Sequence, residues 1–421
     1  MLHRAHPLSR QTAATASSLA LAALGVLLAA ASGCKSNGSD GGAGGTGSGG
    51  SGSSTGSTML VPCAQADVDH CRIDQQACSL EGGKATCVAC DVGTYADEKG
   101  ACSPIAGAPM KHDFAEFSTD SGQEVLGLCQ SWTLGNDADI WVNTVELEQD
   151  MMSHHSNWTF SPETKYPGED GVWPCKDRGY DQLSAAVAGG VIYAQSTQAT
   201  HEVQRFPQGA AVRIPAHSRI IGDVHILNAL AEKVTGHTKL TLYTVPEAEV
   251  AHKLTPFHLT YDKLTIPPHA SSRFSGACTL DADYQTAVGA PYAPKLYYAL
   301  PHTHKLGTRF FMNAVGGPID KQSLIDVVGF NGEARGRNYD PPIDLAGSTG
   351  LAFGCEFENP TDAVVQWGFG DQEMCEMLGF MEMDAAFESR ISEANPMGAD
   401  GDIALFSGAC SSVMIPWKQK Q

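Results

Sequence analysis

The sequence predicts an all-β protein with two tandem β-sandwich domains of jelly-roll type, preceded by a small disulfide-rich module. Gly, Pro, Asn and Asp repeatedly interrupt short apolar or alternating runs that have the length of strands. Helical periodicity is scarce, and the best short helix covers residues 182–188. The β-rich part spans roughly 300 residues, which suits two sandwiches better than one. The clearest expected strands are 210–215, 219–226, 239–245 and 257–261.

The N-terminus predicts export. Residues 1–33 have a basic start followed by an apolar stretch, 19–31, that is too short to span a bilayer. Small residues then precede Cys34, as in a bacterial lipoprotein signal peptide, where this cysteine carries the lipid. The alternative is ordinary periplasmic or secreted export with Cys34 as a free thiol. We expect a lipid anchor on Cys34 that holds the chain to the cell envelope, at the outer membrane or cell surface.

Composition shifts divide the rest of the chain. Residues 34–60 are mostly Gly, Ser and Thr and predict a flexible tether. Residues 61–105 contain six of the thirteen cysteines and predict a cross-linked module that loosely resembles an EGF-like repeat. Its six cysteines allow 15 connectivities, and Cys87 with Cys90 has zinc binding as an alternative. Pro246 separates two strand runs, which gives an N-terminal domain at 106–246 and a C-terminal domain at 247–421.

The charge of the chain excludes some partners. The formal net charge is −20, so the chain repels phosphate backbones and is not expected to bind nucleic acid. It also lacks a basic stripe that would hold it to anionic lipid by charge alone. We therefore expect membrane contact only through the anchor on Cys34.

The stretch Leu300-Pro-His302-Thr-His304-Lys-Leu-Gly contains a first candidate metal site. Residues i and i+2 of a strand point to the same face, so His302 and His304 can present both imidazoles to one ion. Chance and structural histidines also form this pattern, and the pair alone does not decide between them.

Three more histidines form a second candidate site. His154 and His155 are adjacent, and adjacent strand residues face opposite ways, so both can bind one ion only at a bulge or bend. His225 lies inside an apolar strand, in Asp223-Val-His-Ile. Two surface histidines and one core histidine are the structural alternative.

The stretch Glu373-Met374-Cys375 adds a soft donor. A thioether favours copper(I) among biological metals. Met377, Met381 and Met383 alternate after it as on the packed face of a strand, so a core methionine is the alternative for Met374. A disulfide at Cys375 would fix the backbone that aims Met374.

Taken in order, these motifs resemble the copper type II, ascorbate-dependent monooxygenases, whose best-known members are peptidylglycine α-hydroxylating monooxygenase and dopamine β-monooxygenase. The likeness runs from about Cys129 to Cys410. It implies two β-sandwich domains with one copper each, facing each other across a solvent-filled cleft. It also implies an electron-transfer copper on His154, His155 and His225, and a catalytic, oxygen-binding copper on His302, His304 and Met374.

The resemblance carries further expectations. The implied disulfides are Cys129–Cys175, Cys278–Cys410 and Cys355–Cys375. The implied reaction hydroxylates a C–H bond of a small-molecule substrate with O₂ and a reductant of the ascorbate type, and two coppers per chain are the cofactors.

The implied substrate pocket departs from the family pattern. Leu300 replaces the arginine that grips a substrate carboxylate in the peptide-amidating enzyme, and Glu376 and Leu378 replace its substrate-contacting Asn and Tyr. A peptide carboxylate is therefore disfavoured. Glu376 can instead pair with a cationic amine, or it is a solvated surface carboxylate.

Two other functions compete with the oxygenase. The first is a non-catalytic surface lipoprotein that binds or scavenges copper with the same ligands. The second is a carbohydrate- or protein-binding double sandwich with incidental histidines. The presence of Met374 favours the enzyme over a simple copper binder.

Overall fold

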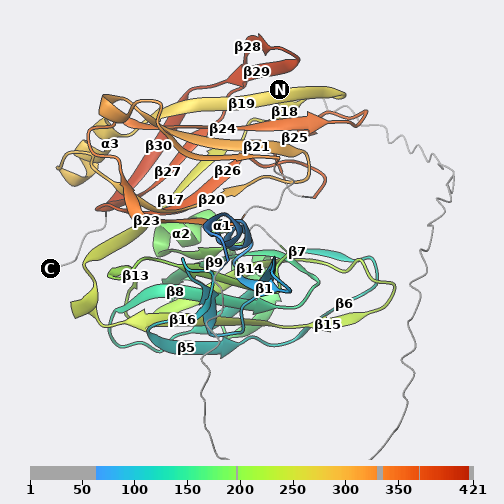
Figure 1. Cartoon of the computed structure of the whole chain (residues 1–421), viewed down its shortest axis with the longest axis vertical. Helices are drawn as coiled ribbons and strands as arrows, with labels where there is room; N and C mark the ends of the chain where they lie inside the picture. Colours follow the sequence, from blue (N-terminus) through green and yellow to red (C-terminus); the bar gives the residue numbers. More distant parts are fainter. Residues whose placement is uncertain (1–62, 196–197, 330–334, 369, 417–421) are drawn as a thin grey trace, which may run out of the picture. The chain divides into compact units, whose positions relative to one another are not determined.

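The computed structural model describes residues 63–195, 198–329, 335–368 and 370–416 (Figure 1). The predicted signal peptide, the tether and Cys34 lie outside these residues. The described chain is all-β, as predicted, with several packed sheets. No helix among the described residues is both long and apolar enough to cross a membrane.

One large sheet runs through both halves of the body, here called the N-terminal half (106–246) and the C-terminal half (247–416). Its path connects strands of the C-terminal half to strands of the N-terminal half through β17 and β13, which pair in parallel. Its members, in path order, are β23 (Arg337–Asp344), β20 (Lys295–His302), β26 (Glu376–Glu382), β17 (His252–Tyr261), β13 (Ala210–Ile214), β8 (Ile140–Gln149), β16 (Thr238–Val245) and β5 (Ala108–Asp113). Three further strands pair beside this path: β12 (His201–Arg205), β27 (Ala385–Ile391) and β30 (Cys410–Pro416).

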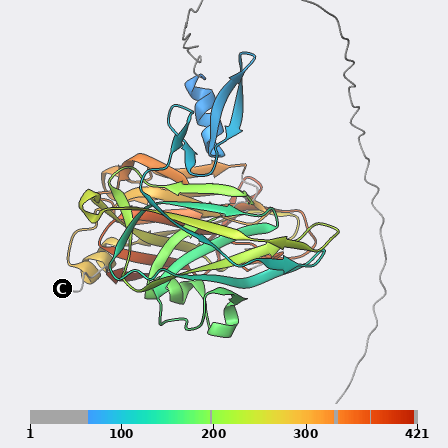
Figure 2. The same ribbon diagram turned by 90° about the horizontal axis from the view of Figure 1, so that it is seen from below.

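Each half adds a second sheet, and an apolar core lies between it and the large sheet. Figure 2 shows the six-cysteine module, in blue, at one edge of the body that these sheets form. In the N-terminal half, the second sheet contains β10 (Gly171–Pro174), β7 (Glu124–Thr133), β14 (Ser218–Leu227), β9 (Ser153–Pro162) and β11 (Gly190–Ala194). In the C-terminal half, it contains β22 (Ser323–Val328), β21 (Gly307–Val315), β24 (Gly350–Asn359), β19 (Ala270–Thr279), β29 (Ile403–Ser407) and β28 (Asn395–Asp400). The small pairs are β15 (Val234–Gly236) with β6 (Phe117–Thr119), and β18 (Thr265–Ile266) with β25 (Val365–Gln366).

Two apolar cores fill the sandwiches. The core of the N-terminal half centres on Trp158 and Phe160 from β9, and that of the C-terminal half on Phe274 and Phe353. The first core also takes in residues of β20 and β26, among them Leu300. The two halves therefore pack through apolar side chains as well as through shared strands.

Helices are few and short. The expected helix at 182–188 is α2 (Gln182–Ala188), which begins at Asp181, whose carboxylate accepts a hydrogen bond from the Ser184 N–H. The other α-helix of the body is α3 (Asp281–Val288). Three 3₁₀ turns complete the body: η1 (Cys175–Arg178), η2 (Glu247–Glu249) and η3 (Gly317–Ile319). The predicted domain boundary at Pro246 lies between β16 and η2.

The twelve cysteines after Cys34 form six disulfides. The three in the body are those that the family resemblance implied, Cys129–Cys175, Cys278–Cys410 and Cys355–Cys375. The module selects one of its 15 connectivities: Cys63–Cys78, Cys71–Cys87 and Cys90–Cys102. Cys87 and Cys90 are thus bonded to different partners, which excludes the zinc alternative. Six disulfides are typical of a protein exported to an oxidising compartment.

The six-cysteine module packs against the N-terminal half. It consists of α1 (Gln65–Ile73), the hairpin β1 (Gln76–Glu81) and β2 (Lys84–Ala89), and the pair β3 (Thr94–Ala96) and β4 (Cys102–Pro104). The side chain of Gln75 accepts a hydrogen bond of 2.8 Å from the Val203 N–H of β12. This contact covers part of the free edge of β12, and an open sheet edge favours unwanted pairing with other chains.

Glu146 of β8 holds the module to the N-terminal half through a hydrogen bond. Its side chain is fully buried and accepts hydrogen bonds from the Gly93 N–H of the module at 2.6 Å and from Tyr243 Oη at 2.8 Å, while His201 Nε2 lies 2.9 Å away. Burial alone would raise the pKa of Glu146, but these hydrogen bonds outweigh it and lower the pKa below its ordinary 4.5.

We expect Glu146→Ala to destabilise the fold by about 3 kcal/mol, because it leaves buried donors without an acceptor. A carboxyl group with a lowered pKa stabilises the native state fully above its ordinary pKa and loses this effect as the pH falls through the lowered value. The difference in unfolding free energy from wild type, measured by urea denaturation, should therefore shrink below about pH 4.5. Glu116→Ala, which removes an exposed carboxylate, is the control and should match wild type.

Candidate metal centre

A β-bulge brings the three predicted histidines of the N-terminal half together. His155 of β9 pairs with His225 of β14, but the next residue of β14, Ile226, pairs with Ser153. His154 is therefore the extra residue of a bulge, and its side chain is released from the strict alternation of the strand. This is the local geometry that two adjacent ligands require.

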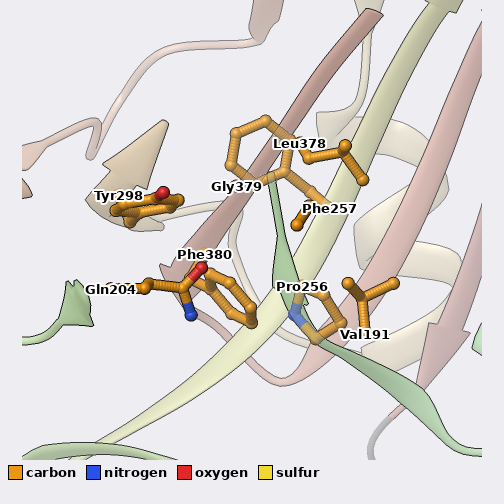
Figure 3. A pocket seen from close by; sticks show the side chains of 9 residues that line it. Val191, Gln204, Pro256, Phe257, Tyr298, Leu378, Gly379 and Phe380 are labelled. Carbon is orange, nitrogen blue, oxygen red and sulfur yellow. The ribbon is translucent and has the colours of Figure 1, made fainter. Parts of the chain in front are cut away.

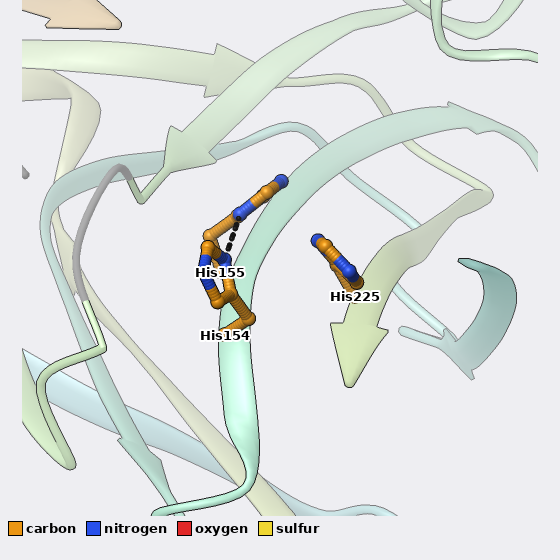
Figure 4. Close-up of side chains that lie close together, drawn as sticks. All are labelled: His154, His155 and His225. Carbon is orange, nitrogen blue, oxygen red and sulfur yellow. Dashed lines mark hydrogen bonds between the residues drawn. The ribbon is translucent and has the colours of Figure 1, made fainter. Parts of the chain in front are cut away.

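The three imidazoles face a common point (Figure 4). Their ligand atoms all lie within 4.8 Å of one another, and Nδ1 of His154 is 2.9 Å from Nδ1 of His155. His225 Nδ1 is buried and has no hydrogen-bond partner in the described part of the chain, whereas its Nε2 lies 2.8 Å from Glu124 Oε1. A buried imidazole nitrogen without a partner fits a metal ligand.

Burial favours the neutral form of His154 and His155. Burial, together with the neighbouring His225 and His304, lowers the pKa of His154 to about 4. Burial also lowers the pKa of His155 well below 6.5, and the neighbouring His302 lowers it in the same direction. Neutral imidazole is the form that binds metal ions, so protons do not compete for these nitrogens at neutral pH.

The second pair of histidines lies at the end of β20. The ring centroids of His302 and His304 are 5.2 Å apart. His304 Nδ1 donates to the carbonyl oxygen of Gln372 at 2.7 Å, which leaves Nε2 for a metal ion. Burial lowers the pKa of His302 to about 4.

Glu373 fixes the segment that carries Met374. Its buried carboxylate accepts hydrogen bonds from the backbone N–H groups of His304 at 2.8 Å and Leu306 at 2.7 Å. Burial raises the pKa of Glu373 to about 7, although these hydrogen bonds oppose the rise. The amino-acid sequence does not identify Glu373 as an anchor, because a buried glutamate beside a methionine has no distinctive pattern.

Met374 lies next to the second pair of histidines along the chain fold. β20 and β26 pair His302 with Glu376, the last pair of their ladder, and His304 forms hydrogen bonds with Glu373 and Gln372, which precede Met374. Met374 is buried, and Cys375 beside it is bonded to Cys355 of β24. Two imidazoles from the end of β20 and a thioether from the segment before β26 are a donor set that fits a copper(I) ion.

The two clusters meet across the halves. The ring centroids of His155 and His302 are 5.4 Å apart, and the ring planes are inclined by 61°. One imidazole comes from β9 of the N-terminal half and the other from β20 of the C-terminal half. Five imidazoles therefore form one continuous group. The expectation of a solvent-filled cleft between the two sets of histidines is wrong for this structure, because His155 and His302 are in ring contact.

The predicted substrate residues share one face of the sheet beside this group. Leu300 is buried in the core of the N-terminal half, and Leu378 packs against the same core. Glu376 is largely buried and lies 3.6 Å from His258, between Oε2 and Nε2. Burial alone would raise the pKa of Glu376, but His258 outweighs it and lowers the pKa. His258 also escaped the sequence analysis, although it interrupts an apolar strand run.

Two cavities lie away from the imidazole group. The first is an apolar gap between the halves, with room for about one water molecule; it lies between Val191, Phe257, Tyr298 and Phe380 (Figure 3). The second, of about 420 Å³, lies near Trp141 and Lys253, where β17 begins. Neither cavity contains a predicted metal ligand.

Comparisons with known proteins add little to this picture. No protein-family model matches the chain, and no curated protein matches it. Among solved structures, the chain is similar to the major capsid protein P2 of bacteriophage PM2, with 7% identity over 64% of this chain and 97% of that one, and a TM-score of 0.31. A putative secreted protein of Parabacteroides distasonis has 8% identity over 73% of this chain and 93% of that one, with a TM-score of 0.17. Likeness at this level carries no functional argument.

We expect copper titration of the purified protein to saturate near two equivalents. His225→Ala should reduce this to about one equivalent. The variant leaves only two of the three imidazoles at the first site, so that site should bind copper too weakly to saturate, whereas the second site is unchanged. His217→Ala, which removes an exposed histidine outside the group, should leave two equivalents. Equal copper binding by all three proteins would exclude His225 as a ligand.

Proposed function

We propose that this chain is a copper-dependent monooxygenase that hydroxylates a C–H bond with O₂ and a reductant of the ascorbate type. The observation that carries the proposal is the bulge at His154, which joins it to His155 and His225 beside a second pair of histidines and a thioether. This donor set is the one that the resemblance to the copper type II, ascorbate-dependent monooxygenases implies.

The two donor sets suit copper in different ways. Imidazole binds copper in both oxidation states, whereas a thioether favours copper(I). When bound, copper would supply the one-electron and oxygen chemistry. In the proposal, the site with His154, His155 and His225 receives electrons, and the site with His302, His304 and Met374 faces O₂ and substrate.

The residues of this chain then have distinct tasks. The bulge in β9 aims two adjacent imidazoles at one ion. The Cys355–Cys375 disulfide and the Glu373 carboxylate restrain the turn that carries Met374, so the weak thioether ligand stays in place. The contact of His155 with His302 would give electrons a short path if copper were held at both sites.

Charge limits the substrate. Leu300 provides no cation for a substrate carboxylate, and Glu376 adds a negative charge close to His302. A substrate with a free carboxylate is therefore disfavoured, and peptide amidation is not proposed. A neutral substrate or a cationic amine suits this face better.

The decisive prediction concerns Met374. Met374→His keeps a ligand but replaces a soft sulfur with a harder nitrogen, so copper should remain bound while hydroxylation falls by orders of magnitude. Each tenfold loss corresponds to about 1.4 kcal/mol of barrier. The measurement is ascorbate-driven O₂ uptake with product analysis, screened over amines, phenols and glycine-extended peptides. Met397→His, at an exposed methionine of β28, is the control and should match wild type.

Two outcomes would redirect the proposal. Full activity of Met374→His would remove Met374 from the oxygen site. A wild-type protein that binds two coppers tightly but yields no product with any substrate class would favour the copper-scavenging lipoprotein.

Anchoring is also proposed. If Cys34 carries a lipid, Cys34→Ser should move the protein from the membrane fraction to the soluble fraction or block its processing. Fractionation and immunoblotting measure this. An unchanged distribution would point to ordinary secretion or to another anchor.

A further inference from the structure

The imidazole of His225 is held between two bulges. One is the bulge at His154 in β9. The other lies in β7 on the opposite side of β14, where the register shifts between Val224 and Ile226 and Gly127 has a φ of +68°. A residue with this φ is a common element of bulges, and glycine adopts it without strain.

The bulge in β7 brings Glu124 to His225. β7 and β14 pair Glu124 with Leu227, two residues beyond His225. Glu124 Oε1 lies 2.8 Å from His225 Nε2, and 42% of the Glu124 side chain is exposed. Because Nε2 donates to the carboxylate, the tautomer is fixed with its lone pair on Nδ1, the buried nitrogen that faces the other two histidines.

In the second site, the ligand imidazole of His304 has a different kind of hydrogen-bond partner. His304 donates to the neutral carbonyl oxygen of Gln372 rather than to a carboxylate. Glu376 lies opposite His302 in the register of β20 and β26, and its Oε2 is 3.6 Å from Nε2 of His258. The two sites therefore differ in the hydrogen-bond partner of a ligand imidazole, which is a carboxylate for His225 and a carbonyl oxygen for His304, as well as in the sulfur ligand.

We infer that Glu124 is a positioning residue that orients His225 and makes the first copper site the more reducing of the two. A carboxylate behind a ligand imidazole raises the basicity of that ligand, and its negative charge stabilises the more highly charged copper(II). The thioether of the second site favours copper(I). Electrons would thus pass downhill from the His225 site to the Met374 site. This inference rests on the proposed function, because it assumes copper at both sites.

The test replaces the carboxylate in two ways. Glu124→Gln keeps an oxygen acceptor and removes the charge, whereas Glu124→Ala removes both. Asp120→Asn is the matched control, because it also removes one negative charge from an exposed side chain close to the start of β7. Thermal unfolding of the metal-free proteins checks that all variants fold.

Two quantities are measured: the copper content and the reduction potential of each site. Electron paramagnetic resonance, recorded during a redox titration, gives the potentials. For Glu124→Gln we expect two coppers and about a tenfold shift toward copper(I) at the first site, which equals about 59 mV for one electron. For Glu124→Ala we also expect copper(II) affinity at that site to fall about 10- to 100-fold. The second site and the Asp120→Asn protein should keep wild-type potentials.

Other outcomes would overturn the inference in separate ways. If wild type binds two coppers and both Glu124 variants keep its potentials and affinities, Glu124 has no such role and the proposed function is untouched. If Glu124→Gln loses the first copper altogether, Glu124 is itself a ligand. If wild type fails to bind two coppers, the proposed function fails first.

Discussion

The parallel pairing of β13 with β17 is the constraint on which the rest of the structure depends. It joins strands of the two halves into one sheet and places β20 and β26 against the core of the N-terminal half. Two separately folded sandwiches joined by a linker would be free to move apart, as domains with small interfaces commonly do. Here the shared strands and the apolar contacts fix His302 beside His155.

Local patterns predicted much of this fold. Strand-length apolar runs gave β13, β14, β16 and part of β17, and α2 has the predicted bounds. These elements depend on side-chain period and on turn residues, which are visible in a short window of sequence. The disulfides of the body came from the family resemblance, because cysteine spacing alone does not select a pairing.

The sequence could not predict what depends on contacts between distant segments. The sharing of one sheet by both halves requires pairing of β13 with β17, and neither strand differs from an ordinary buried strand. Glu124 and His225 are 101 residues apart, and only two bulges bring them together. His154 and His155 can bind one ion only if the strand has a bulge there, and the pairing of β9 with β14 contains this bulge. The amino-acid sequence contains no comparable reason to select Glu124, His258 or Glu146.

Burial disfavours the charged form of a titratable group unless hydrogen-bond partners compensate for the lost water, and Glu146 and the buried imidazoles show the two results. Glu146 is removed from water but surrounded by donors, so it remains a carboxylate and holds the module. The imidazoles of His154, His155 and His302 are removed from water and lie close to one another, and their pKa values are lowered. A cluster of neutral imidazoles with an unpartnered Nδ1 on His225 is costly to bury unless something binds it. A ligand that binds only the native state lowers its free energy by mass action, so a metal ion at this cluster would stabilise the contact between the halves. In the proposed enzyme, the same ions that perform the chemistry would also help to hold the two sandwiches together.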